Sequence, residues 1–278
     1  MEILNEITKE VFEREIPAAK MPERNTSVYE RMKGMIQQAY DTAINRIVSP
    51  EHEGLLEAND SLKKLFVRRI CLDAFIRTCR SLDLVLTATG FGIVSTDSTA
   101  PASRARVDAL IEELTVEKLN ATGRMVTMLT SMPGWGETEQ AKNVINTLFY
   151  SPDHLMMFTS LPLTSQSWIM ATGRAAQADT LLRKEISEEY MDELLQKTRT
   201  ATLANADHII VQKCRLFIAD YISQGDQSCP NKVILQQIME QLETYPGSYP
   251  TYRQSRIYQK RHADRYENQK QDPTFFFM

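Results

Sequence analysis

Apolar residues recur every three or four positions along most of this chain. The clearest case is "SLKKLFVRRICLDAFIRTCRSLDLVL", where leucine, isoleucine and phenylalanine repeat at that spacing and the lysines and arginines fall between them. This periodicity predicts a long amphipathic helix from Ser61 to Leu86. Asn59 or Ser61 is suited to cap its first turn, since both side chains can accept a backbone hydrogen bond.

The helical pattern recurs in five further segments, whereas strand signals are confined to two short stretches. Pro101 and Pro230 lie just before two of the segments, in keeping with the preference for proline at helix starts. The candidate strands are "FGIVST" at 91–96 and "LMMFTSLPL" at 155–163, both bounded by loop residues. The sequence therefore predicts an all-α helical bundle. The five further helical segments are 27–48, 103–129, 179–200, 205–223 and 231–245.

A break at "MPGWGE" divides the helical pattern into two parts. Pro133, Gly134 and Gly136 predict a turn around Trp135, whose ring either fills a seam between two lobes or contacts a partner. We expect a bundle over 25–245 with possible lobes at 25–132 and 137–245. Residues 1–24 are expected to form an N-terminal arm or short helix, and residues 246–278 an extended C-terminal tail.

Composition places the chain among globular proteins. It has 278 residues, of which 42% are hydrophobic and 24% are charged, enough to build a sizeable core. No apolar run reaches the roughly 18 to 20 residues needed to cross a bilayer, so no membrane association is expected. The segment "MEILNEITKEVFERE" mixes acidic and apolar residues, unlike a secretory signal. We therefore expect the protein to be made and to act in a cytoplasm, or in something assembled there.

Charge is distributed unevenly. The whole chain has a net charge of −4, but residues 251–278 carry six basic and three acidic residues, so the preceding 250 residues carry −7. An acidic body disfavours tight binding of nucleic acid, which needs basic groups clustered on the contact face. The basic tail can contact either phosphate or the acidic surface of another protein.

Motifs that would indicate catalysis or metal binding are absent from the sequence. The four cysteines form no CxxC pair, and the four histidines are dispersed without a nucleophile or carboxylate at a suggestive spacing. Asp153 and His154 are adjacent, which turn formation and capping explain. No HExxH, GxSxG, GxxxxGK[ST] or complete GxGxxG pattern occurs. We predict no enzyme activity, no catalytic residues, no metal and no cofactor; an enzyme with an unrecognised site stays an open alternative.

Two aromatic features are predicted to bind partners. Phe91 lies between Gly90 and Gly92 in "TATGFGIVSTDSTAPASRARV", where a chain leaving a helix can present one exposed ring. After Pro246 and Pro250, tyrosines alternate with basic residues before the terminal "DPTFFFM", a composition typical of the centres of protein interfaces. The predicted partner-binding residues are Phe91, Trp135, Tyr252, Arg256, Tyr258, Arg261, Phe275, Phe276 and Phe277.

The aromatic tail has two interpretations. Three buried phenylalanines would contribute roughly 1.5 to 3 kcal/mol each, and an exposed aromatic tail would favour aggregation. The tail is therefore expected either to dock on a neighbouring subunit or other protein, the favoured interpretation, or to fold back onto its own bundle.

The helical body, the segment "TATGFGIVSTDSTAPASRARVDAL" and the tail ending "DPTFFFM" together resemble an uncharacterised family encoded in phages and prophages of gut anaerobes. Within that setting the chain is similar to helical head-tail connectors, also called adaptors or head completion proteins. Such proteins are small helical bundles that form rings, often of twelve subunits, beneath the portal. The present chain is long for an adaptor.

The resemblance implies a virion structural protein of the neck, assembled in the host cytoplasm. Its expected partners are the portal protein, other neck or tail proteins, and further copies of itself in a ring. Double-stranded DNA would pass through the ring without being specifically bound, which suits an acidic body. The alternative is a non-viral helical binding module whose C-terminus is a peptide ligand.

Overall fold

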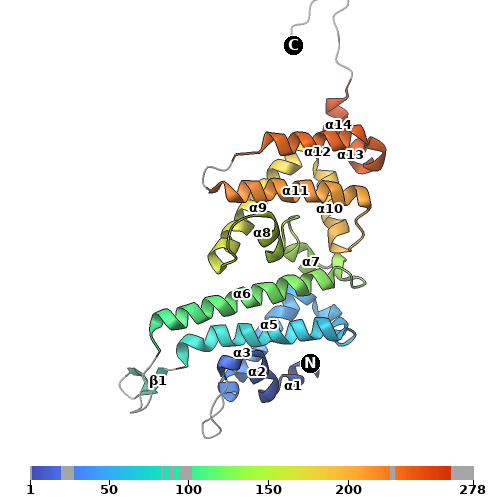
Figure 1. The fold of residues 1–278 in the computed structure, drawn as a ribbon. Helices are drawn as coiled ribbons and strands as arrows, with labels where there is room; N and C mark the ends of the chain where they lie inside the picture. The colour runs from blue at the N-terminus through green and yellow to red at the C-terminus, as the bar shows by residue number, and fades with distance from the viewer. Residues whose placement is uncertain are drawn as a thin grey trace, which may run out of the picture.

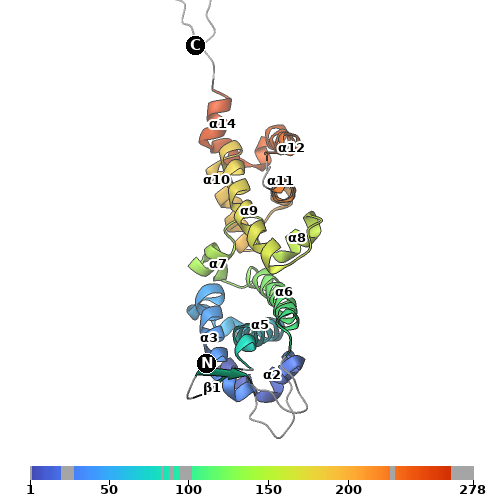
Figure 2. The ribbon, with the colours of Figure 1, turned by 90° about the vertical axis from the view of Figure 1, so that its left-hand side faces the viewer.

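The computed structural model describes residues 2–19, 28–82, 84–87, 90–93, 102–225 and 229–263. The fold is all-α, as predicted, with one addition: β1 (Leu84–Thr87) and β2 (Gly90–Ile93) pair as an antiparallel hairpin, with Leu84 opposite Ile93. The helices stack into an elongated molecule, seen in both views of the ribbon (Figure 1, Figure 2).

The N-terminal half forms one end of the stack. Its long helices α3, α5 and α6 pack side by side, and the short helices α1 and α2 cover them (Figure 1). The elements of this half are α1 (Glu2–Glu6), α2 (Lys9–Glu15), η1 (Pro17–Ala19), α3 (Val28–Ala43), η2 (Ile44–Val48), η3 (Pro50–His52), α4 (Gly54–Glu57), α5 (Asp60–Thr78), η4 (Cys79–Ser81) and α6 (Arg104–Leu129).

The C-terminal half forms the other end. In it α9, α10 and α11 pack together, and α12 to α14 lie beyond them at the end of the molecule (Figure 1). Its elements are η5 (Trp135–Glu137), α7 (Glu139–Val144), α8 (Pro152–Phe158), α9 (Ser165–Glu185), α10 (Glu188–Arg199), α11 (Asn205–Ser223), α12 (Lys232–Thr244), η7 (Pro246–Ser248), α13 (Pro250–Gln254) and α14 (Arg256–Arg261).

Several helix ends follow the side chains that the sequence provides. The Asn59 Oδ1 accepts hydrogen bonds from the backbone nitrogens of Ser61 and Leu62, which confirms Asn59 as the cap of α5. Asn231 caps α12 in the same way, directly after Pro230. One buried apolar core runs through both halves, so the molecule's two ends share a single hydrophobic interior.

Two predicted boundaries are wrong. The helix predicted from Ser61 to Leu86 is α5, and it ends at Thr78. Leu86 lies instead in β1, opposite Phe91. Near this end the Ser81 hydroxyl donates to the Thr78 carbonyl, a local bond that competes with helical pairing. The second error is the continuous helix over 179–200, since α9 and α10 are separate helices.

The break between α9 and α10 has a clear cause. Ser187 is extended, and its Oγ accepts a hydrogen bond from the Tyr190 nitrogen at 2.9 Å, so it caps a new helix. Of the two candidate strands, 91–96 is found in part as β2, whereas Leu155 lies in α8. Capping of α8 by the buried Ser151, with Pro152 following it, accounts for helix there.

Residues 246–278 also differ from their predicted form where the structure describes them, whereas the described part of residues 1–24 is helical, one of its two predicted forms. Helices α1 and α2 pack onto the bundle, with Ile3, Ile7 and Phe12 buried in the core. The segment from Pro246 to Arg261 is helical rather than extended. Pro246 and Pro250 each occupy the first turn of a new short helix, where a missing N–H has no cost.

Candidate interaction site

The contact between the two halves, which we term the seam, is centred on Trp135. The Trp135 ring is fully buried, and its Nε1 donates to the Ile47 carbonyl at 2.8 Å. The Gln140 Nε2 donates to the Asn45 carbonyl at 3.1 Å beside it. A buried tryptophan with its one donor satisfied is a packing residue. The structure therefore supports the seam interpretation of Trp135 and corrects its assignment as a partner-binding residue.

Close backbone approach holds η5, which carries Trp135, against α10 within the C-terminal half. Gly134 adopts φ 78°, which makes the tight turn into η5. A Cβ atom on Gly136 would lie 2.6 Å from the Arg199 carbonyl oxygen, so only glycine fits between η5 and the end of α10. The turn that Pro133, Gly134 and Gly136 predicted is therefore present, and it places Trp135 in the core.

The irregular chain between α7 and α8 is held by arginines from the C-terminal half. The Arg199 Nε donates to the Ile145 carbonyl and the Arg215 Nε donates to the Leu148 carbonyl, both at 3.0 Å. From α6, the Glu112 carboxylate accepts from the backbone nitrogen and hydroxyl of Ser165, at the start of α9. Charge-assisted bonds of this kind satisfy backbone groups that no helix pairs.

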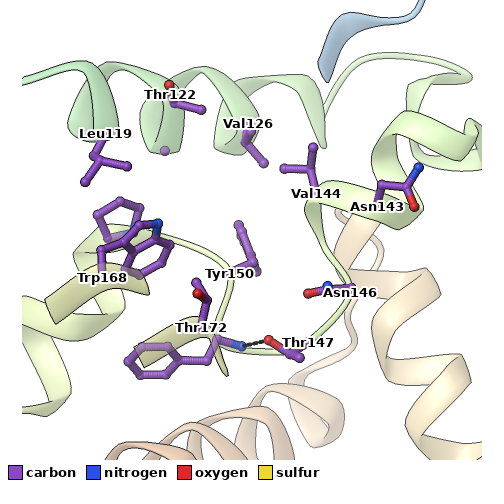
Figure 3. Close-up of a pocket in the computed structure, with 13 residues that line it drawn as sticks. Leu119, Thr122, Val126, Asn143, Val144, Asn146, Thr147, Tyr150, Trp168 and Thr172 are labelled. Carbon is purple, nitrogen blue, oxygen red and sulfur yellow. Dashed lines mark hydrogen bonds between the residues drawn. The ribbon is translucent and has the colours of Figure 1, made fainter. Parts of the chain in front are cut away.

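A pocket of about 250 Å³ lies along the seam (Figure 3). Leu119, Thr122 and Val126 of α6 form one wall, and Trp168 and Thr172 of α9 lie across from them. The remaining lining is Gly123, Asn143, Val144, Asn146, Thr147, Phe149, Tyr150 and Pro152. This lining offers hydroxyl and amide groups but no carboxylate, imidazole or thiol.

His154 lies in α8 next to this region as an uncharged structural residue. Its Nδ1 accepts a hydrogen bond from the Ser151 nitrogen at 3.4 Å, and the rings of Phe149, Tyr150 and Phe158 surround it. Burial, assisted by the nearby Arg215 guanidinium, lowers the pKa of His154 to about 3. The imidazole is therefore neutral at physiological pH, and its bond to the Ser151 nitrogen confirms the capping explanation of His154.

The predicted partner-binding residues of the C-terminal region separate into buried and exposed groups. Tyr252 is fully buried, its hydroxyl donates to Glu243 at 2.5 Å, and its ring packs against Tyr190 and Tyr258. It is a core residue, which corrects its assignment to a partner surface. Burial, followed by the Glu243 hydrogen bond, raises the pKa of the Tyr252 phenol.

Tyr258, Arg256 and Arg261 lie on α14. Tyr258 is half-buried against the core, Arg256 is exposed, and Arg261 donates to the Glu185 carbonyl at 2.8 Å. Arg261 therefore ties α14 to the end of α9. Phe91 lies in β2, opposite Leu86, and nothing further is described of its side chain. Phe275, Phe276 and Phe277 lie outside the described residues.

A surface that the sequence analysis missed lies on α8 and α9. Met156, Met157, Ile169 and Met170 are exposed on these two helices, which pack against each other, and we term them the α8–α9 surface. No Asp, Glu, Lys or Arg occurs between Asp153 and Arg174. The sequence indicates this surface by an uncharged run in a chain that is 24% charged. Residues 155–163 of that run were instead predicted to form a strand.

The described residues hold neither a cluster of metal-ligating side chains nor a helix suited to span a membrane. No group of three or more His, Cys, Asp or Glu side chains in this part of the chain is placed to hold a metal ion. Within the same residues, no helix has the length and apolarity needed to cross a bilayer. Cys71 and Cys214 are buried free thiols, and burial raises the pKa of Cys71 to about 12.

Comparison with known proteins gives one match. The sequence model of a family of unknown function (DUF6712) matches residues 25–145, which is less than half of the chain. The matched part runs from just before α3 through α6 to the end of α7, and includes the β1–β2 hairpin. Neither a curated protein nor a solved structure matches the chain.

Proposed function

We propose that this chain is a non-catalytic structural subunit of a bacteriophage virion, located in the neck as part of the head-tail connector ring. Its partners would be the portal protein, other neck or tail proteins and further copies of itself. The assignment to a virion comes from the resemblance of the segment around Phe91 and the "DPTFFFM" terminus to phage-encoded proteins.

The observation that favours an assembly subunit is the α8–α9 surface. A monomeric soluble protein seldom leaves several large apolar side chains together in water, and such surfaces mark interaction sites. Here Met157 and Ile169 are about three-quarters exposed on adjacent helices, within a run of 20 residues that has no Asp, Glu, Lys or Arg. Burying these side chains against another subunit would be favourable.

The negative charge of residues 1–250 is compatible with the passage of DNA through such a ring. Residues 1–250 carry a net charge of −7, and a lumen with this character would repel phosphate rather than hold it. Ring subunits meet head to tail, so each needs two different complementary surfaces. The α8–α9 surface supplies one, and the C-terminal region, with exposed Arg256 on α14, supplies a second.

Counting this chain in purified particles tests the proposal directly. Quantitative mass spectrometry of particles from the source virus or induced prophage, normalised to the major capsid protein, should give about a dozen copies per particle. Absence from the particles would contradict the connector role and favour the non-viral binding module instead.

Deletion of residues 274–278 tests whether the terminal phenylalanines dock the subunit in the particle. The shortened chain should fold, as judged by circular dichroism and thermal melting, but should be missing from particles. Normal incorporation of the shortened chain would show that the terminal phenylalanines are not a docking element.

A further inference from the structure

The α8–α9 surface is apolar and built from adaptable side chains. Met157 is 73% exposed and Met156 49% exposed on α8, while Ile169 is 72% and Met170 36% exposed on α9. Three of these four residues are methionines, whose flexible, polarisable side chains adjust to irregular partners and make favourable contacts with aromatic rings. A partner that presents aromatic side chains is therefore the best chemical match.

The chain itself contains such a partner segment. Its last six residues, "PTFFFM", combine three phenylalanines with no charged side chain. The run that carries the α8–α9 surface has no Asp, Glu, Lys or Arg of its own, and Arg174 follows it beside Ile169 and Met170. The aromatic end of the chain and the methionine-rich surface are therefore complementary in polarity.

The position of α14 favours contact between two copies. In both views α14 lies at the end of the molecule beyond α11 and α12, and in Figure 2 it lies on the opposite side from α8. A further 15 residues follow Ala263, which could extend roughly 50 Å at about 3.3 Å per residue. A segment of this length can reach a neighbouring copy, and α14 lies away from the α8 of its own chain.

We infer that the α8–α9 surface is the receptor for residues Phe275 to Phe277 of a second copy of this chain. This inference rests on the proposed function, because it names the subunit contact by which copies would join in a ring. The contact is heterologous: the surface of one copy receives the C-terminus of the next, so a series of identical contacts can close into a ring.

Peptide binding tests the contact with the full-length protein. A fluorescent peptide of residues 268–278 is titrated with a full chain in which Phe275, Phe276 and Phe277 are replaced by serine, so that the receptor is free. Fluorescence anisotropy should show saturable binding. The double variant Met157→Glu with Ile169→Glu should weaken that binding at least tenfold, because it places two charges in the receptor.

The matched control is Val233→Glu, an equally drastic change at a residue that is 64% exposed on α12, away from the surface. Its affinity for the peptide should be unchanged. If the double glutamate variant melts early, Met157→Gln with Ile169→Gln replaces it and should still weaken binding. Equal affinity for the surface variant and the control, or no binding at all, would overturn the inference.

Disulfide trapping separates contact between copies from contact within one chain. Two chains are mixed, one with Met157→Cys and the other with Thr274→Cys, both carrying Cys229→Ser to remove the exposed native thiol. A disulfide should join the two different chains under mild oxidation. A single chain that carries both cysteines is the comparison. If that chain forms an internal disulfide while the mixture gives no cross-linked product, the segment folds back onto its own chain, and contact between copies is overturned.

These assays need no virus, so the inference and the proposed function can fail separately. If the peptide binds but purified particles contain no copies of this chain, the contact between copies stands and the virion role is rejected. The opposite result is also possible: the chain is present in particles, but the surface variant and the control variant bind the peptide equally well. The virion role would then stand, and the α8–α9 surface would not be the receptor.

Discussion

The seam and the α8–α9 surface are both rich in apolar residues, but they differ in what surrounds them. At the seam, Trp135 is buried, and the backbone carbonyls of Ile47 and Asn45 accept bonds from Trp135 and Gln140. On the α8–α9 surface, Met157 and Ile169 are about three-quarters exposed. Aromatic or apolar character alone therefore does not identify a binding residue; the burial of its side chain shows whether the fold already uses it.

The largest expected effect of breaking the seam comes from Trp135→Ala. Removal of a fully buried indole should lower the free energy of unfolding by about 3 to 5 kcal/mol, through lost burial and a residual cavity. Urea denaturation measures the loss. Trp168→Ala is the control, since the Trp168 ring is only partly buried, and its loss should be smaller. Equal losses would show that Trp135 has no special role at the seam.

Gly136→Ala should have the next largest effect. The added methyl group would meet the Arg199 carbonyl oxygen at 2.6 Å, and backbone cannot yield cheaply, so we expect destabilisation near the upper end of about 1 to 3 kcal/mol. Gly34→Ala in α3 is the matched control, because nothing lies within 4 Å of its Cβ position. The control should gain roughly 0.5 to 1 kcal/mol. A thermal melt in which both variants gain stability would contradict the close approach.

Acid should weaken the region beside the seam through His154. The folded pKa of His154 is lowered to about 3, whereas the unfolded imidazole titrates near 6.5, so below pH 6.5 the unfolded state binds a proton that the folded state does not. Stability is therefore intact above about pH 6.5 and falls as pH decreases. At pH 5 the expected loss is about 2 kcal/mol, from roughly 1.4 kcal/mol per unit.

Denaturation at pH 7.5 and at pH 5 measures this dependence, and a His154 variant separates His154 from the other three histidines. His154→Leu should be less stable at pH 7.5, because it removes the acceptor of the Ser151 nitrogen, but its stability should depend less on pH. An unchanged slope against pH in the variant would show that another group causes the dependence.

The smallest effect is expected on the α8–α9 surface. Met157→Ser together with Ile169→Ser should change the free energy of unfolding by less than about 0.5 kcal/mol per site, because both side chains are largely exposed. Urea denaturation of the dilute protein provides the measurement. A loss comparable to that of Gly136→Ala would show that these residues belong to the core and would remove the contrast with the seam.

Sequence periodicity predicted most of the fold and the bounds of several helices, but not every boundary. The helices over 103–129, 205–223 and 231–245 appear as α6, α11 and α12, because their apolar stripes match the helical period and face a common core. The break at Ser187 and the strand that contains Leu86 depend on local hydrogen bonds and pairing, which a repeating apolar pattern does not reveal.

The candidate site was less predictable than the fold. Tyrosine and arginine in the C-terminal region have the composition of an interface, yet Tyr252 joins Tyr190 inside the protein and Arg261 binds the end of α9. Only tertiary packing decides between these uses. The α8–α9 surface was visible as an uncharged run, but its exposure depends on how α8 and α9 lie on their neighbours.

The bond between Arg199 and the Ile145 carbonyl crosses the end of the region that matches the family. The matched family region ends at residue 145, and the Ile145 carbonyl is itself held by Arg199, which lies outside that region. A fragment cut at this boundary would keep α3, α5 and α6 but lose the helices that cover one side of α6. The matched region on its own would therefore leave the side of α6 that α8 and α9 cover open to water, and a chain trimmed to it would need another partner there.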